Sequence, residues 1–132
     1  MYQVIKINEF SATRTVELKS EITGERDICF DDSALVSSNN FYFMEEGKSY
    51  DCYIKLFGDI SDEGSQKAVK CKIVSNEVIG NREFLKVFVN KDVYYIPKNK
   101  VQGVTENHFW FTYTRKDLIK VDETIHDDLL RK

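Results

Sequence analysis

Two adjacent carboxylates, Asp31 and Asp32, directly follow a short apolar segment at residues 28–30. Paired carboxylates can share a proton or hold a metal ion, as acid–base catalysis often requires. On a strand, however, neighbouring side chains point to opposite faces, and an Asp before a Ser is also typical of a helix start. The pair alone therefore does not predict a catalytic site.

A second acidic segment, residues 59–64 (DISDEG), has the spacing of the first half of a calcium-binding loop. Asp59, Ser61 and Glu63 occupy the first, third and fifth positions of such a loop, and Gly64 the sixth. The twelfth position should be a Glu that completes the coordination, but it is Lys70, whose charge would repel the ion. We interpret the segment as a solvated loop between strands.

The histidines and cysteines do not form a recognisable reactive motif. His108 and His126 lie 18 positions apart, and neither is part of a nucleophile motif. Cys29, Cys52 and Cys71 include no Cys-x-x-Cys pair, so they do not predict a zinc site. Unpaired thiols are typical of a reducing compartment, which predicts a cytoplasmic protein. The sequence thus predicts a non-enzymatic protein without a metal or cofactor.

The elements that position these residues are mostly strands, because apolar and polar residues alternate along much of the chain. Strands are expected at residues 2–8, 14–19, 28–30, 49–57, 67–74, up to 79, 84–89, 92–96 and 108–114. Near the end of the chain, Thr124 and Asp127 have the spacing of a capping box, which predicts a helix within residues 121–132. We therefore expect one mainly β domain over residues 1–132, a small antiparallel barrel or sandwich of about seven or eight strands with a short C-terminal helix.

The alternation gives several strands an unusual second face. In residues 84–89, Leu85, Val87 and Val89 share an apolar face, whereas the opposite face carries aromatic, lysine and aromatic side chains. Aromatic rings can stack on bases while lysines contact phosphates, but the same residues can also pack beneath a covering segment. If the strands are neighbours, the face consists of Tyr53, Lys55, Phe57, Lys70, Lys72, Phe84, Lys86 and Phe88.

The net charge of −3 is unevenly distributed along the 132 residues. Residues 1–47 contain nine Asp or Glu and four Lys or Arg, whereas residues 48–100 contain seven and ten. The total argues against a general binder of duplex DNA, which is usually basic. No segment has the roughly 18 consecutive apolar residues of a transmembrane helix, and residues 1–10 lack the apolar run of a signal peptide, so no membrane partner is expected.

Two functions of different classes follow. The first is a binding domain that acts through a protein with a basic surface, as an inhibitor or immunity-type protein does, because acidic side chains in loops can steer and pair with a basic cleft. Its predicted interface residues are Asp31, Asp32, Glu45 and Glu46. The alternative is an OB-like domain that binds single-stranded nucleic acid through the aromatic–lysine face.

Overall fold

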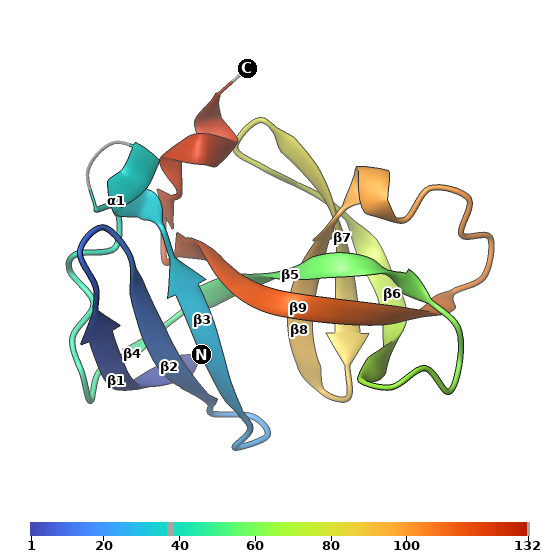
Figure 1. Cartoon of the computed structure of the whole chain (residues 1–132), viewed down its shortest axis with the longest axis horizontal. Coiled ribbons are helices and arrows are strands. Elements are labelled where there is room, and N and C mark those ends of the chain that lie inside the picture. Colours follow the sequence, from blue (N-terminus) through green and yellow to red (C-terminus); the bar gives the residue numbers. More distant parts are fainter. Residues whose placement is uncertain (37–38, 132) are drawn as a thin grey trace.

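The computed structural model describes residues 1–36 and 39–131, and strands dominate it (Figure 1). The strands are β1 (Tyr2–Glu9), β2 (Arg14–Ser20), β3 (Arg26–Asp31), β4 (Ser49–Tyr50), β5 (Cys52–Ser61), β6 (Ala68–Ile79), β7 (Arg82–Val89), β8 (Asp92–Pro97), β9 (His108–Val121) and β10 (Thr124–Ile125). The helical turns are α1 (Ser33–Val36), η1 (Lys98–Lys100) and η2 (Asp127–Leu130). The expected mainly β fold is confirmed.

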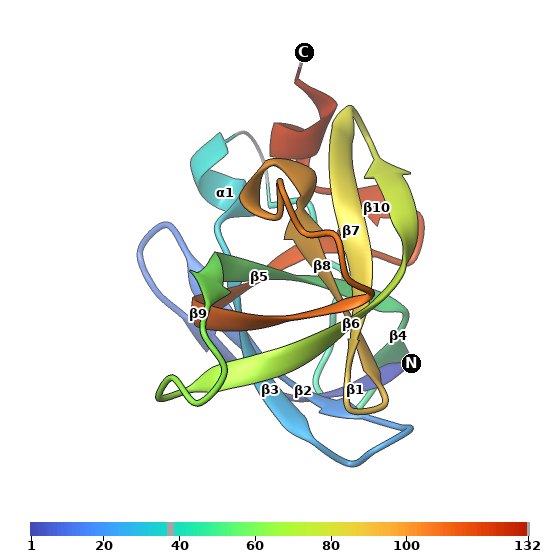
Figure 2. The same ribbon diagram turned by 90° about the vertical axis from the view of Figure 1, so that its right-hand side faces the viewer.

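Five strands close a barrel in the order β5, β8, β7, β6 and β9, with β9 pairing back to β5. The pairs are antiparallel except β5 with β8, which is parallel and joined at Lys55 and Tyr95. Figure 2 looks onto the wall formed by β6, with β9 and β5 on one side and β7 and β8 on the other. Of the two expected architectures, the chain therefore adopts the barrel.

Strands β1, β2 and β3, with the two-residue strand β4 at the edge, form an extra sheet in the order β4, β1, β2 and β3. This sheet lies on the left of Figure 1 and joins the barrel through β9, to which β3 is paired in parallel at Phe30 and Asp117. Strand β9 is 14 residues long and also pairs with β5, β6 and β10. It is thus the strand that the two halves of the molecule share.

The main core fills the barrel and continues under the extra sheet. Ile54 and Leu56 of β5 and Val87 of β7 are at most 1% exposed, and Leu85 is 7% exposed. On the extra sheet, Leu18 is fully buried in the same cluster. These positions are the apolar faces that the alternation predicts, because successive side chains of a strand point to opposite sides.

A bulge bends β5 where it passes β9. The register between the two strands shifts between Phe57 and Gly58. A Cβ atom at Gly58 would lie 2.0 Å from the carbonyl oxygen of Thr112, so no side chain fits there without moving the backbone. The bulge increases the local twist, which helps a strand follow the curvature of a small barrel.

The end of the chain is less helical than the sequence predicts. Thr124 and Ile125 form β10, which pairs with Val121 and Lys120 of β9 after a turn at Asp122, whose φ is 51°. The capping box is therefore not formed, because its first residue belongs to a hairpin. The short C-terminal helix is the single 3-10 turn η2, and its N-cap is His126.

A second, smaller core lies between this C-terminal turn and the outside of the barrel. Leu129 of η2 packs there with Phe84, Tyr95, Ile119 and Ile79. The turn between β6 and β7 holds the chain end over this core, because Asn81 donates two hydrogen bonds of 2.6 Å, from its backbone to Leu129 O and from its side chain to Leu130 O.

Buried carboxylates connect the extra sheet to the barrel. Asp27 of β3 accepts a hydrogen bond of 2.6 Å from the Tyr94 hydroxyl and pairs with Lys116. Burial alone would lower the pKa of Lys116, but the hydrogen bond and the charge of Asp27 outweigh this effect and raise it. Asp92 accepts hydrogen bonds of 2.6 Å from the hydroxyls of Ser20 and Thr23. These contacts hold the two halves in one arrangement.

Candidate functional site

The three thiols are packed and protonated. Cys29, Cys52 and Cys71 are buried and form no disulfide. Burial raises the pKa of Cys52 and of Cys71 to about 12 each and also raises the pKa of Cys29. Because the thiolate is the reactive form, these cysteines are poor nucleophiles and poor metal ligands in the folded chain.

His126 forms a hydrogen-bonded pair with Asp32. Such pairs occur in active sites, but here both ring nitrogens of His126 have partners within the chain. Its Nδ1 accepts a hydrogen bond of 3.0 Å from the backbone N–H of Asp128, so Nε2 carries the proton in the neutral ring. Nε2 then donates to Asp32 Oδ1 at 2.6 Å. Both nitrogens are therefore engaged, and the side chain fastens the C-terminal turn to the end of β3. Across the described residues, no group of three or more His, Cys, Asp or Glu is arranged to hold a metal ion.

The four predicted interface acids do not form one exposed patch. Asp31 is 2% exposed and accepts a hydrogen bond of 2.8 Å from Arg14 Nε, so it is part of the interior. Asp32 lies on the surface but binds His126. Glu45 pairs with Lys48, and Glu46 accepts a hydrogen bond of 2.8 Å from a backbone N–H of β1. Each of the four carboxylates thus has a partner within the chain.

The predicted aromatic–lysine face is divided by the strand order, because β8 lies between β5 and β7. Tyr53 stacks on Tyr95 with the ring centroids 5.2 Å apart, and Phe84 is 2% exposed in the second core. Lys55 lies 3.6 Å from Asp117. These side chains pack or pair within the chain, whereas Phe57 remains 45% exposed near the C-terminal turn.

The other members of that face lie together on the barrel wall. Lys72 of β6 is opposite Phe88 of β7, and Lys70 is two residues earlier on β6. Two neighbours from β9 join them, because Trp110 is opposite Lys70 and His108 is opposite Lys72. We call this surface the lysine wall, which consists of Lys67, Lys70, Lys72, Lys86, Phe88, Lys91, His108 and Trp110.

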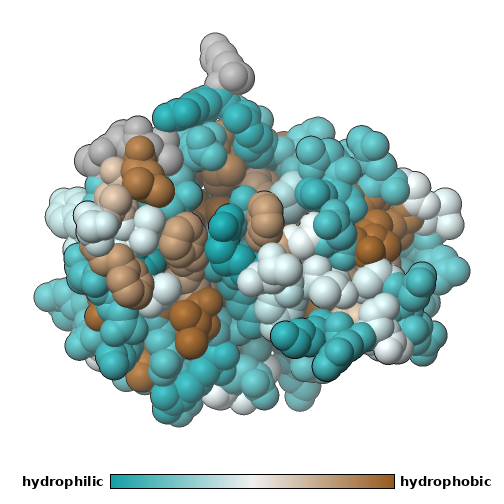
Figure 3. Space-filling model, viewed as in Figure 1, coloured by the Kyte–Doolittle hydropathy of each residue, from teal (hydrophilic) through white to brown (hydrophobic). Residues whose placement is uncertain are grey.

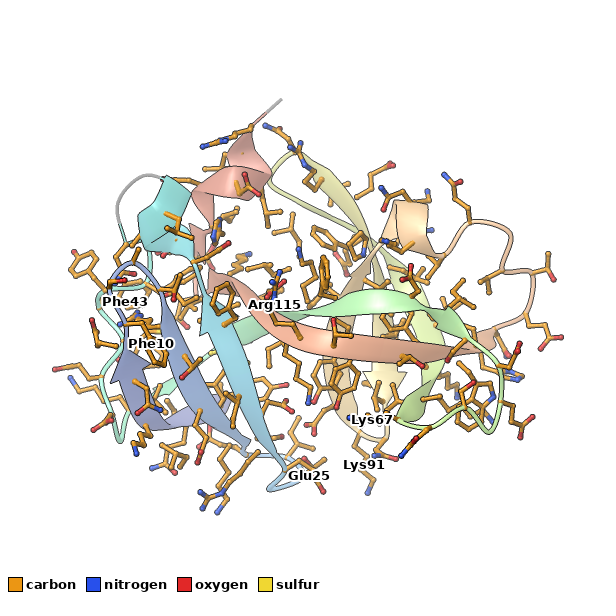
Figure 4. All side chains as sticks on the ribbon, viewed as in Figure 1. Phe10, Glu25, Phe43, Lys67, Lys91 and Arg115 are labelled. Atoms are coloured by element: carbon orange, nitrogen blue, oxygen red, sulfur yellow. The ribbon has the colours of Figure 1, made fainter. Side chains whose placement is uncertain are left out.

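The lysines of the wall are available for a ligand. Within the described residues, none of the five lies within 4.0 Å of a carboxylate, whereas Lys48, Lys55, Lys100 and Lys116 do. Lys67 and Lys91 mark its ends at the lower rim of the barrel in Figure 4. Figure 2 separates these ends, since β6 begins on one side of the lower barrel and the turn between β7 and β8 lies on the other.

The aromatic members are partly exposed. Phe88 is 37% exposed, and Trp110 is half-buried. His108 lies at the edge, where its Nε2 is 3.5 Å from Glu106. No Asp or Glu takes an outward position in the rows formed by Lys70 with Trp110 and by Lys72 with Phe88. The wall therefore combines free positive charge with accessible rings.

A second feature lies under the C-terminal turn, on the face shown in Figure 3. Arg115 of β9 stands between Phe30 and Phe57, with its guanidinium carbon 5.0 and 4.6 Å from the two ring centroids (Figure 4). Its hydrogen bonds to Asp117, of 2.5 and 3.1 Å, raise the pKa of the guanidinium. A hollow of about 150 Å³ is lined by Lys55, Arg115 and Asp117, and a separate cavity of about 450 Å³ opens beside Phe57 toward η1. We call this region the arginine groove, defined by Phe30, Lys55, Phe57, Arg115 and Asp117.

The sequence alone missed Trp110 and His108 as members of the wall, and Arg115 as the centre of the groove. The pairing of β6 with β9 brings the first two beside Lys70 and Lys72. The density of lysines in residues 67–91 was the available signal, but only the register shows which aromatic residues accompany them.

No protein-family model matches this chain, and no curated protein matches its sequence. None of the helical turns in the described part of the chain has the length and apolar character needed to span a membrane.

Proposed function

We propose that the protein binds single-stranded nucleic acid through the lysine wall. The observation that carries the proposal is the interleaving of partly exposed aromatic rings with lysines that have no ion pair among the described residues, at Lys70 beside Trp110 and at Lys72 beside Phe88. Proteins that bind single strands combine positive charge along the backbone with rings that stack on bases. The wall supplies both kinds of contact on one rigid sheet.

The acidic total charge is compatible with this proposal because the charges are separated in space. Residues 1–47, which hold nine acidic and four basic residues, form the extra sheet and its adjoining loops. The β6 and β9 part of the wall lies on the opposite half of the molecule (Figures 1 and 2), whereas Lys86 lines a cavity together with Tyr2 and Ser20 of the extra sheet. Screening is nearly complete beyond about 10 Å at 0.1 M salt, so distant acids weaken binding mainly at low ionic strength.

Titration with mixed-sequence single-stranded DNA and RNA, followed by Trp110 fluorescence, tests the proposal. We expect saturable quenching that weakens with salt, with a slope of about −0.7 in log K against log salt for each phosphate contact. Lys70→Gln and Lys72→Gln should each weaken binding and make the slope shallower by about 0.7. The matched control is Lys19→Gln, because Lys19 is an exposed lysine of the extra sheet and has no ion pair within residues 1–36 and 39–131. Absence of binding, or equal effects of all three substitutions, would contradict the proposal.

A protein partner remains the second candidate, and the arginine groove favours it. Its exposed Phe57 and its centrally placed Arg115 are of the residue types enriched at interfaces, and the groove carries charges of both signs. An inhibitor or immunity-type role stays a prediction. Affinity capture with the wild type, Phe57→Ser and Glu45→Gln separates the possible surfaces. A partner lost only with Phe57→Ser lies at the groove, whereas one lost with Glu45→Gln lies at the acids predicted from the sequence.

A further inference from the structure

If the lysine wall binds nucleic acid as proposed, its geometry also limits the ligand. We infer that the ligand is an unpaired segment of at least three nucleotides that crosses the barrel strands, with Trp110 and Phe88 stacking on bases that are not adjacent. The inference rests on the proposed function and adds the direction in which the strand crosses the wall and the minimum length of the ligand.

The strand registers fix the positions of the Trp110 and Phe88 rings relative to each other. Trp110 of β9 is directly opposite Lys70 of β6, and Phe88 of β7 is directly opposite Lys72 of β6. Strand β6 therefore lies between the two rings, and its two lysines are two residues apart on the same outward face. A path from one ring to the other must pass over this pair of lysines.

The spacing between strands and the rise per residue give the separation of the two rings. Two neighbouring-strand spacings amount to about 10 Å, and two residues along a strand to about 7 Å, so the diagonal is about 12 Å. Successive stacked bases in a duplex strand are only about 3.4 Å apart. Two adjacent stacked bases therefore cannot reach both rings, and at least one nucleotide must bridge them.

The charges support a path across the strands. Lys70 and Lys72 lie under the bridging nucleotide, where its flanking phosphates would pass. Lys86, two residues before Phe88 on β7, and Lys91, in the following turn, continue the positive charge beyond one ring. A duplex could meet these charges with its phosphates, but its paired bases could not stack on either ring. The wall should therefore discriminate against duplex.

The length dependence tests this arrangement. Oligothymidines of two to eight nucleotides, and a duplex of the longest length, are titrated while Trp110 quenching and fluorescence anisotropy are recorded. We expect weak binding of the dinucleotide, a steep rise between two and four nucleotides, a shallow rise beyond that and weaker binding of the duplex. Phe88→Ala should reduce the affinity for the tetranucleotide by about 5- to 150-fold, the range measured for loss of one stacked base.

The same variant should leave the binding of the dinucleotide to Trp110 unchanged. Phe10→Ala is the matched control, because Phe10 is 60% exposed and belongs to the extra sheet side of the molecule (Figure 4). If Phe88→Ala loses stability, Phe88→Leu keeps an apolar side chain at this partly buried position while removing the ring.

The possible failures are distinguishable. If no oligonucleotide binds, the proposed function is wrong. If the duplex binds equally well, both proposals are wrong. If single strands bind more tightly than the duplex, but binding grows evenly with length or is unaffected by both Phe88 variants, the proposed function stands and this inference is overturned.

Discussion

Gly80→Ala tests the contact between the β6–β7 turn and the C-terminal turn η2. Gly80 has a φ of 61°, and a Cβ atom there would lie 2.5 Å from the carbonyl oxygen of Leu129 and 3.0 Å from its carbonyl carbon. Because these are backbone atoms, the chain end must move away. The substitution should therefore break the two hydrogen bonds that Asn81 donates to this segment.

The cost can be worked out from these contacts. A left-handed conformation costs a non-glycine residue about 1–2 kcal/mol. Loss of the two hydrogen bonds adds about 1 kcal/mol each, and partial exposure of Leu129, now 7% exposed, adds up to about 2 kcal/mol. We expect a total loss of about 3–6 kcal/mol in the free energy of unfolding.

Gly103→Ala is the matched control, measured by urea unfolding under the same conditions. Gly103 has a φ of 85°, but a Cβ atom added there would have no other atom within 4 Å, so only the conformational cost of about 1–2 kcal/mol applies. The effect of alanine on the unfolded chain is similar in both variants and cancels in the comparison. Equal losses of stability in the two variants would refute the reasoning, because they would show that the close approach at Gly80 has no energetic consequence.

Three further outcomes are expected. Asp31→Asn should cost up to about 3–5 kcal/mol in urea unfolding because the buried Arg14 loses its buried partner and keeps only the longer contact of 3.7 Å with the exposed Glu9, whereas Glu45→Gln at an exposed ion pair should cost less than about 1 kcal/mol. The stability should fall between pH 9 and 12, because the pKa of Cys52 is raised from 9.0 to about 12 on folding and the unfolded chain loses this proton first; Cys52→Ala should make the decline shallower by up to about 1.4 kcal/mol per pH unit. Gly58→Ala should destabilise the barrel at least as much as Gly80→Ala, which the shift of the urea midpoint would show or disprove.

The faces of individual strands could be predicted from the sequence, because alternation is a local property. The spacing of Leu85 and Val87 predicts that they share the core face, and both are buried. The short C-terminal helix is present as η2, but the capping box expected at Thr124 is not formed because hairpin pairing with β9 takes precedence over the local capping pattern. Tertiary pairing of this kind depends on residues elsewhere in the chain and leaves little local signal.

The candidate sites were harder to predict for the same reason. Asp31 looked like a loop carboxylate, but its partner Arg14 is 17 positions earlier, on a neighbouring strand. The alternation of their strands predicts one shared face for Lys70 and Phe84, yet the register of β6 with β7 places Phe84 opposite Glu77, seven positions beyond Lys70, in the packed second core. Strand register is set by long-range contacts, which alternation does not encode.

The position of β9 also determines how the molecule unfolds. This strand is paired with β3 of the extra sheet, with β5 and β6 of the barrel and with β10. Unfolding of β9 would therefore remove backbone hydrogen bonds from both halves at once. The two halves should accordingly unfold in one cooperative transition, with no stable intermediate that retains only one of them. In native-state hydrogen exchange, the amides of Leu118 and Val121 should open only with global unfolding and should share one free energy with the slowest amides of β2.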